Sequence, residues 1–312
     1  MTRKALGPAG LQVVQAVQAA VSSRMLVACS GGADSLALAA AAAVVGLRNR
    51  WGVRAVVVDH GLQAGSGQIA KQTAERLWTH EIAAEVVAVD VDADKVGLEA
   101  AAREARYAAL STAAAPDEVI LLGHTLDDQA ETVLLGLARG SGVRSLAGMP
   151  PARGPFRRPL LGVRRAVTRM ACEEFGLEWW EDPQNADARF TRARVRHDVL
   201  PVLEAQLGPG IAEALARTAD AARADADCLD ALAAAWQGPM DAETLAGLDP
   251  AIRWRVLRDW LRAAGSQELG SVHLAAVDEL ITNWHGQKGV DVPGLRVVRV
   301  AGQLRANDPK PS

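Results

Sequence analysis

The first half of the chain alternates short apolar runs with longer segments of helical pattern. The apolar runs are typical of buried strands and lie at Met25–Cys29, Ala55–Val58, Val86–Val89 and Val119–Leu122. Helical patterns occupy Ser35–Val45, about Gln68–Thr79, Leu98–Thr112 and about Leu126–Ala138. This alternation predicts an α/β fold with a doubly wound, mostly parallel sheet and helices on both faces. Ligands in such sheets bind outside the carboxyl ends of the strands.

The second half is mainly helical in pattern. Ser141–Pro159 is rich in Gly, Pro and Arg and predicts an irregular loop, whereas Val290–Val300 predicts a β-hairpin that turns at Pro293 and Gly294. Helical patterns occupy Arg164–Phe175, about Thr191–Glu204 and Ile211–Trp236. Leu207–Gly210 is the predicted linker. We therefore expect a catalytic domain over residues 1–206 and a smaller, mainly helical C-terminal domain over residues 211–312.

Composition places the chain among water-soluble globular proteins. It has 312 residues, 49% hydrophobic and 23% charged, enough for about two domains. No uncharged apolar run reaches the roughly 18 residues of a membrane span. Gln12, Gln15 and Gln18 interrupt the N-terminal apolar pattern, so it does not resemble a signal peptide. We expect a cytoplasmic protein without a membrane partner, and a homodimer is left open.

The cysteines give no sign of a disulfide framework or a zinc site. Cys29, Cys172 and Cys228 are far apart in sequence and form no CxxC pair. We expect all three to be reduced thiols.

Arginines are concentrated in one part of a chain whose net charge is only -3. Residues 139–169 contain no Asp or Glu and eight arginines: Arg139, Arg144, Arg153, Arg157, Arg158, Arg164, Arg165 and Arg169. Such a stretch of one charge sign is typical of phosphate binding and predicts a nucleic-acid partner. A GC-rich genome would explain arginine in place of lysine, but it would not explain the missing acids.

One hexapeptide lies between the first predicted strand and the first predicted helix. It consists of Ser30, Gly31, Gly32, Ala33, Asp34 and Ser35. Adjacent glycines let the backbone close around an anion, and the N–H groups that begin a helix point towards it. Asp34 would repel a phosphate unless it held Mg²⁺, as carboxylates do beside nucleotides. A turn without chemical function is the alternative, but an acid and a hydroxyl in the same turn argue against it.

This hexapeptide resembles the SGGxDS motif of the PP-loop ATP pyrophosphatase superfamily. The resemblance implies that ATP is cleaved between its α and β phosphates and that a carbonyl oxygen is adenylated. The GxxxxGK[ST] pattern of Walker-type kinases and GTPases does not occur in the chain.

Further candidate residues follow the other predicted strands. Asp59 and His60 follow the second strand, and the helix after the third carries Arg103 and Arg106. Each pair alone is a weak signal, because such residues often cap strands or face solvent. The segment after the fourth strand, GHTLDDQAET over residues 123–132, contains His124 and three carboxylates. Two of these carboxylates, at positions 128 and 131, share a helix face and could bind a metal or a cationic amine.

Taken in order, these segments resemble those of the tRNA(Ile)-lysidine synthetases. The matching segments are SGGADS, VDHGL, AREARY, GHTLDDQAETVLLGLARGSG, RPLL, EDPQN and FTRARVR, which span about residues 24–205. Ala193 departs from the family, which usually has a polar residue there. The C-terminal part resembles the family only in its helical character.

The resemblance implies a reaction and a role for each candidate residue. ATP would adenylate the C2 carbonyl of the wobble cytidine of tRNA(Ile) with a CAU anticodon, and free L-lysine would then displace AMP. Asp34 would bind Mg²⁺, Asp128 and Glu131 the lysine amine, and His124 and Arg106 would act at the phosphates. ATP would also contact Ser30, Gly31, Gly32, Ala33, Ser35, Asp59, His60 and Arg103. The tRNA would contact Arg139, Arg157, Arg158, Arg192, Arg194 and Arg196.

Two alternatives remain at this point. A PP-loop tRNA thiolase would share the adenylation, but such enzymes generally use paired cysteines or an iron–sulfur cluster. A catalytically silent ATP- or tRNA-binding protein would not need Asp34, Asp128 and Glu131 together.

Overall fold

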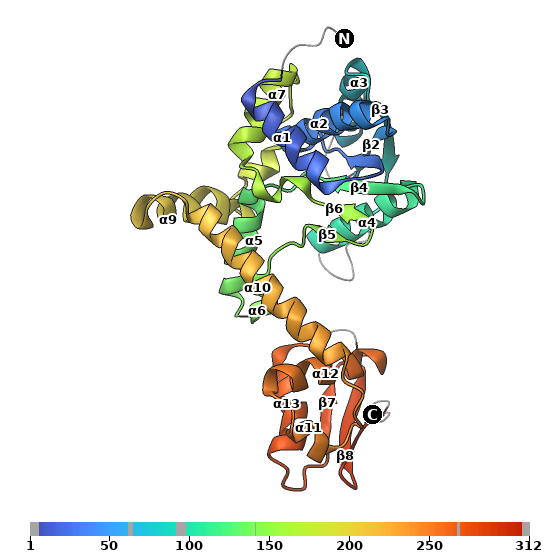
Figure 1. The fold of residues 1–312 in the computed structure, drawn as a ribbon, viewed down its shortest axis with the longest axis vertical. Helices are drawn as coiled ribbons and strands as arrows, with labels where there is room; N and C mark the ends of the chain where they lie inside the picture. Colours follow the sequence, from blue (N-terminus) through green and yellow to red (C-terminus); the bar gives the residue numbers. More distant parts are fainter. Residues whose placement is uncertain (1–5, 62–64, 92–97, 141, 267–268, 308–312) are drawn as a thin grey trace. The chain divides into compact units, whose positions relative to one another are not determined.

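The computed structural model describes residues 6–61, 65–91, 98–140, 142–266 and 269–307 (Figure 1). The chain divides into two compact units. One comprises Met1–Gly140 and Ser145–Asp220, and the other comprises Ser141–Arg144 and Ala221–Ser312. The division falls within the long helix α10 (Ile211–Ala234), beyond the linker predicted at Leu207–Gly210.

The first unit is built on a six-stranded sheet with the order β3-β2-β1-β4-β6-β5. The strands are β1 (Arg24–Ala28), β2 (Val53–Asp59), β3 (Ala83–Ala88), β4 (Glu118–Leu122), β5 (Ala152–Arg153) and β6 (Phe156–Arg157). All neighbouring strands are parallel except β5 and β6. The predicted doubly wound, mostly parallel sheet is therefore confirmed.

Side chains of each inner strand alternate between two apolar layers. Ala55 and Val57 pack against one group of helices, whereas Val56 and Val58 pack with α4 on the opposite face. The first group contains α1 (Pro8–Ala20), α2 (Ala33–Asn49), α3 (Ser66–Thr79) and α7 (Arg165–Phe175), and α4 spans Leu98–Ala113. Helices therefore cover both faces, as the sequence pattern predicts.

The connection between strands creates a switch point beside β1. The chain runs from β1 through β2 to β3 and then returns to β4 on the other side of β1. The carboxyl ends of β1 and β4 are therefore neighbours from which the chain leaves in different directions, which is where ligands bind in open α/β sheets. Helices α2 and α5 (Leu126–Ala138) begin directly after these two strands.

The segment from residue 142 to 207 is more regular at its start and less regular at its end than its sequence pattern predicts. The predicted loop Ser141–Pro159 contains the short helix α6 (Val143–Leu146) and strands β5 and β6, which are too short to give a pattern. The predicted helix Thr191–Glu204 is divided into α8 (Thr191–Arg194), a π-helical turn and α9 (Leu200–Leu207). Two 3₁₀ turns lie at Pro159–Gly162 and Pro183–Ala186.

The second unit has its own apolar core, which includes Leu245, Leu257, Leu261, Val277 and Val297. Its remaining helices are α11 (Ala242–Ala246), α12 (Pro250–Ala263) and α13 (Ser271–Thr282). They are accompanied by an antiparallel sheet of β7 (Val290–Val292), β8 (Leu295–Val300) and β9 (Gln303–Asn307). The predicted hairpin is present as β7 and β8. Strand β9 was not predicted, because Leu304 is its one buried side chain.

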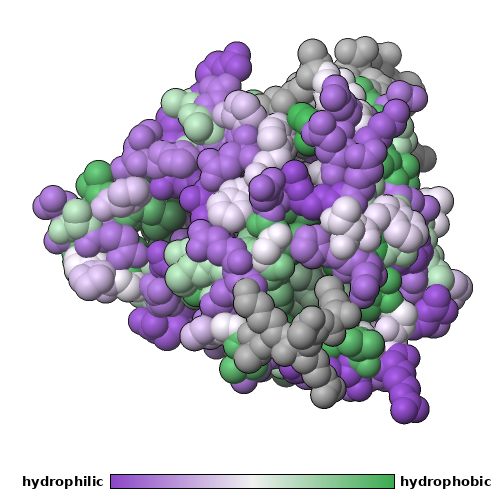
Figure 2. Space-filling view, turned by 90° about the horizontal axis from the view of Figure 1, so that it is seen from above, coloured by the Kyte–Doolittle hydropathy of each residue, from purple (hydrophilic) through white to green (hydrophobic). Residues whose placement is uncertain are grey.

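Hydrophilic side chains are spread over the molecular face shown in Figure 2, with smaller apolar areas between them. Within the described parts of the chain, every helix is too short or too polar to cross a bilayer.

Candidate active site

The SGGADS turn joins β1 to α2 and is closed by hydrogen bonds within itself. Gly31 has a left-handed backbone (φ 83°), and a Cβ there would lie 2.5 Å from Oγ1 of Thr73, so only glycine fits. The buried Ser35 hydroxyl donates to the Gly32 carbonyl over 2.9 Å and accepts from the Ser30 backbone N–H over 3.1 Å. Ser35 therefore shapes the turn, while Ser30 is exposed at its surface.

The segment after β4 lies directly against this turn. A Cβ at Gly123 would be 3.2 Å from both the backbone nitrogen and the Cα of Ser35, so the two strand ends are in backbone contact. Thr125 then begins α5 with a capping box: Asp128 accepts from the Thr125 N–H over 2.8 Å and from its hydroxyl over 2.9 Å. Capping thus fixes the position of Asp128 beside the SGGADS turn.

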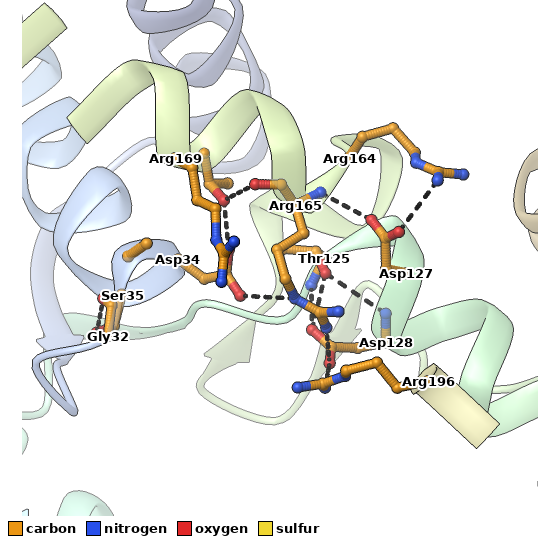
Figure 3. A network of polar contacts seen from close by, with 12 residues as sticks. Gly32, Asp34, Ser35, Thr125, Asp127, Asp128, Arg164, Arg165, Arg169 and Arg196 are labelled. Atoms are coloured by element: carbon orange, nitrogen blue, oxygen red, sulfur yellow. Dashed lines mark hydrogen bonds and ion pairs between the residues drawn. The ribbon is translucent and has the colours of Figure 1, made fainter. Parts of the chain in front are cut away.

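One arginine at the start of α7 connects the acids of the two segments (Figure 3). Arg165 places Nη2 2.7 Å from Oδ1 of Asp128 and Nε 3.4 Å from Oδ2 of Asp34. Both of its terminal nitrogens lie 3.4 Å from Oε1 of Glu131. The Thr168 hydroxyl, one turn further along α7, donates to the other oxygen of Asp34. The structure therefore brings Asp34, Asp128 and Glu131 together. They surround Arg165, a cation that the sequence analysis did not place in the site.

The fully buried Glu131 is held by further arginines from the RARVR segment. Its Oε1 accepts from Nε of Arg196 over 2.7 Å, and Arg192 Nε lies 3.3 Å from its other oxygen. A π-helical turn over Val195–Val199 contains Arg196, and π-helical turns frequently occur at functional sites. Ala193, at which this chain departs from the family, is buried, and its methyl group needs no hydrogen-bond partner there.

The pKa values of Asp34 and Asp128 are shifted in opposite directions. Burial raises the pKa of Asp34, although Thr168 and Arg165 oppose the change. Burial acts in the same direction on Asp128, but Arg165, the Thr125 N–H, His124 and Arg196 outweigh it and lower the pKa of Asp128. Asp128 is therefore held ionised, which suits it to bind a cation more than to accept a proton.

A second cluster, which is cationic, lies beside Asp128 and consists of His60, Arg103, Arg106, His124 and Arg158. Four of its buried nitrogens lack a hydrogen-bond partner within the described residues: Nδ1 of His60, Nε of Arg106, Nδ1 of His124 and Nε of Arg158. Buried polar atoms are nearly always paired in proteins. Unpaired donors among several positive charges are therefore typical of a site whose anion is not part of the polypeptide.

Tyr107 organises part of this cationic cluster. Its hydroxyl accepts from Nη2 of Arg158 over 3.1 Å and from Arg103 over 3.2 Å, while its ring packs on Phe156 at 4.8 Å between centroids. Burial lowers the pKa of His124 to about 3, and the charges of Arg158, Arg106 and Arg103 act in the same direction. Burial and Arg106 also lower the pKa of His60. Both imidazoles are therefore neutral at pH 7.

A cavity of about 140 Å³ adjoins the acidic side of the site. Carboxylates of Asp127, Glu131 and Glu204 and the cations of Arg164, Arg165 and Arg196 line it. Leu200, Pro201 and Ala212 form its apolar wall. A cavity with this lining suits a small molecule that carries both charge signs and an aliphatic chain.

No group of three metal-ligating side chains occurs in the described parts of the chain, so a metal cage made by protein alone is absent from them. Mg²⁺ at nucleotide sites needs only one or two carboxylates, because phosphate oxygens and water complete its shell. Asp34, within the SGGADS turn, fits that requirement. The three cysteines are free thiols, as expected.

Comparison with known proteins identifies the family. A PP-loop domain model matches residues 9–203, and a TilS substrate binding domain model matches residues 240–305. A tRNA(Ile)-lysidine synthase of Mycolicibacterium paratuberculosis is 55% identical over 88% of this chain and 87% of its own length. Those of Nocardia farcinica and Rhodococcus opacus are 54% and 53% identical, over 89% and 92% of this chain and 90% of their own lengths. The chain belongs to the tRNA(Ile)-lysidine synthase family.

A solved structure of a different activity shares the fold. The U34-tRNA thiolase of Methanococcus maripaludis, solved with its [4Fe-4S] cluster, is 17% identical, with a TM-score of 0.54 over 67% of this chain and 78% of its own. This likeness shows the PP-loop fold alone, whereas the lysidine synthases share both domains and half of the sequence. The C-terminal part resembles the family more closely than its helical pattern indicates, because it matches a family domain.

The arginine-rich stretch lacks acids in sequence but not in space. Arg144, Arg164, Arg165 and Arg169 each form an ion pair with a carboxylate from outside the stretch. Arg158 is buried in the cationic cluster, and Arg192 and Arg196 lie on Glu131. Of the six arginines predicted to contact tRNA, Arg139 and Arg194 are exposed and Arg157 is half-buried, so these three are the better placed for an external phosphate.

Sequence reasoning missed several members of this lysidine synthase site. Arg165 counted only as one arginine among eight, and Thr168 carried no signal because its contact with Asp34 joins two distant helices. Asp127 accepts from the Arg165 backbone N–H over 2.7 Å and pairs with Arg164, so it holds the start of α7 against α5. Sequence reasoning assigned a role to the neighbouring Asp128 and none to Asp127.

Proposed function

We propose that this chain joins free lysine to C2 of the wobble cytidine of tRNA(Ile) with a CAU anticodon, at the expense of ATP, through an adenylated tRNA intermediate. One structural observation carries the proposal beyond family membership. The anion-binding turn after β1 and the acidic cluster after β4 are in backbone contact at Gly123 and Ser35. A nucleotide and a cationic amine could therefore approach one base from the two sides of a single site.

The phosphates of ATP are assigned to the SGGADS turn and the cationic cluster. The N–H groups that begin α2 supply donors on one side. Arg106, Arg158, His60 and His124 supply unpaired buried nitrogens on the other. Both imidazoles are neutral in the free protein, so each can donate one hydrogen bond, and an adjacent phosphate favours the protonated form. We assign Mg²⁺ to Asp34, where it would neutralise charge that develops on the phosphates.

Free lysine is assigned to the cavity beside Glu131. The ammonium groups of lysine would face Glu131, which lines the cavity, and Asp128, which pairs with the same arginines, and the carboxylate of lysine would face Arg196. Its aliphatic chain would lie along Leu200 and Pro201. Removal of the proton from the ε-ammonium costs on the order of 4–5 kcal/mol at pH 7, from a pKa of about 10.4. Asp128 is too acidic to accept that proton readily, so its proposed role is to orient the amine.

The tRNA is assigned to Arg139, Arg157 and Arg194 on the first unit and to the substrate-binding domain matched over residues 240–305. An anticodon loop is single-stranded, so its base can enter a pocket without melting of a duplex. We place the reaction in the cytoplasm, and the homodimer stays a prediction.

The decisive experiment supplies the protein with ATP, Mg²⁺, bulk tRNA and radiolabelled lysine. We expect label in tRNA, with release of AMP and pyrophosphate. ADP as the product would contradict the PP-loop chemistry. Label that enters tRNA only from a sulfur donor would establish a thiolase instead. If neither modified tRNA formed, the chain would be a binding protein without catalytic activity.

A further inference from the structure

Arg165 belongs to both halves of the site at once. Its guanidinium contacts Asp34, which the proposed function assigns to Mg²⁺, and Asp128 and Glu131, which it assigns to the lysine amine. The position that two substrate cations would fill is therefore taken by a cation of the chain itself. Its side chain is 18% exposed, so water does little to screen these contacts.

The contacts of Arg165 are unequal. Nη2 is 2.7 Å from Asp128, which is the length of a strong charge-assisted hydrogen bond, whereas the contacts to Asp34 and Glu131 are at 3.4 Å. The Arg165 backbone is fixed, because its N–H donates to Asp127 over 2.7 Å. The side chain can therefore change partners while α7 stays in place.

We propose that Arg165 couples the two substrate sites, so that binding of the magnesium–nucleotide complex draws Arg165 away from Asp128 and Glu131 and strengthens the binding of free lysine there. This inference rests on the proposed function. A divalent cation on Asp34 repels the adjacent guanidinium, and the nucleotide phosphates offer that guanidinium a new anion. Arg165 then leaves Oδ1 of Asp128, which keeps Arg196 at 3.1 Å and can accept the incoming ammonium in place of Arg165. Before that exchange, lysine has to compete with Arg165.

The two bindings are therefore thermodynamically linked through one residue. If nucleotide strengthens lysine binding by some factor, lysine strengthens nucleotide binding by the same factor. The consequence for the enzyme is a preferred order, in which lysine binds more tightly once the nucleotide is bound.

The test measures lysine binding by calorimetry in the presence and absence of Mg²⁺ and an ATP analogue with a methylene bridge between its α and β phosphates. For the unaltered protein we expect the lysine Kd to fall about tenfold when the analogue is present, within the usual range of such couplings. In Arg165→Met the Kd should be the same under both conditions, because Arg165 no longer competes and Arg196, which also pairs with both carboxylates, is present under both conditions.

Arg165→Lys separates this role from a loss of charge or of folding. Its single ammonium cannot contact Asp34 and Asp128 together, so the ratio of the two Kd values should again be near one although the charge is kept. Arg169→Met is the matched control, since Arg169 lies on the same helix and pairs only with the exposed Glu181 among its described contacts. Its ratio should equal that of the unaltered protein. Circular dichroism establishes that each variant is folded.

The outcomes distinguish this inference from the function on which it rests. If the unaltered protein binds both ligands and the lysine Kd is insensitive to nucleotide, Arg165 is not a coupling residue and the proposed function stands. Persistence of the tenfold ratio in Arg165→Met would overturn the inference in the same way. A protein that binds no lysine under either condition would overturn both.

Discussion

The backbone of Gly123, after β4, touches the backbone of Ser35, in the turn after β1. A Cβ at position 123 would be 3.2 Å from the Ser35 nitrogen, closer than side chains normally approach. The atoms that this Cβ would meet belong to the backbone of Asp34 and Ser35, not to a flexible side chain. A methyl group can therefore be accommodated only if the two strand ends separate.

Gly123→Ala should therefore weaken ATP binding more than it lowers stability. We expect the KM for ATP to rise about tenfold or more, because overpacking costs about 1–3 kcal/mol and acts on the turn to which we assign the phosphates. Gly162→Ala is the matched control, since a Cβ there meets no atom within 4 Å. An unchanged KM for ATP in Gly123→Ala would show that the spacing of the strand ends is unimportant for nucleotide binding.

Asp34→Ala should abolish adenylation while the protein stays folded. The Thr168 hydroxyl keeps the Arg165 carbonyl as a partner at 2.7 Å, and Arg165 keeps Asp128, so both former partners of Asp34 remain satisfied. We expect the rate of pyrophosphate release to fall on the order of 100-fold, the scale of losing one electrostatic partner of a transition state. A folded variant that still forms adenylated tRNA would remove Asp34 from the nucleotide site.

The sequence was sufficient for the four longer strands of the sheet and for most side chains of the candidate site. Strands β1 to β4 and helices α2 to α5 have strong apolar periodicity, so their order could be predicted, and their bounds could be predicted to within a few residues. The chemistry after β1 and β4 could be predicted because it is concentrated in two short segments. Strands β5 and β6 are two residues each, and no pattern exists at that length.

Ion pairs between distant segments were the part that could not be predicted. Arg165 meets Asp34 across 131 positions of sequence, and Arg196 meets Glu131 across 65. Along the sequence, these arginines stand in acid-free stretches that suggest phosphate contacts. The fold brings carboxylates from α2 and α5 to these arginines. A local sequence pattern cannot predict such contacts between distant segments.

His124 should make the stability of the protein depend on pH between 7 and 5. Its pKa of about 3 in the folded protein lies below the ordinary histidine value of about 6.5, so on acidification the unfolded chain takes up a proton that the folded protein refuses. Stability from this residue is complete above pH 6.5 and is lost progressively below it. His124→Gln should therefore lose less Tm between pH 7.5 and pH 5.5 than the unaltered protein.

The exposed His285 provides the comparison for this measurement. His285→Gln should follow the unaltered protein across the same pH range. A saturating ATP analogue should reduce the pH dependence of the unaltered protein, because a phosphate beside His124 stabilises the imidazolium form. Equal losses of Tm in all three proteins would contradict the burial of a neutral imidazole at position 124.

Arg139 and Arg157 should contribute to tRNA binding through charge. Replacement of each by alanine should weaken tRNA binding and reduce the slope of log K against log salt by about one. ATP binding should be unchanged. Arg24→Ala is the control, because Arg24 is exposed at the opposite end of β1 and pairs with Asp117. A slope that is the same in all variants would mean that the tRNA phosphates lie elsewhere.

Glu131 decides between an amine site and a metal site on α5. It is fully buried, and Arg196, Arg192 and Arg165 all face it, so Glu131→Gln removes one negative charge from among three positive ones. Breaking a buried ion pair costs on the order of 3 kcal/mol, and the Tm should fall accordingly. Activity is therefore compared at a temperature at which circular dichroism shows the variant folded.

If Glu131 helps to bind lysine, Glu131→Gln should raise the KM for lysine at least about tenfold while adenylation continues. Single-turnover reactions with ATP labelled in the α-phosphate would then accumulate labelled tRNA when lysine is limiting, and excess lysine would discharge it. If Glu131 instead holds Mg²⁺, labelled tRNA would fail to form at any lysine concentration. We favour the amine, because Glu131 lines the 140 Å³ cavity with Leu200 and Pro201, whereas Asp34 lies in the SGGADS turn to which we assign the phosphates. An aliphatic wall beside a carboxylate suits an alkyl ammonium and offers nothing to a hydrated divalent ion.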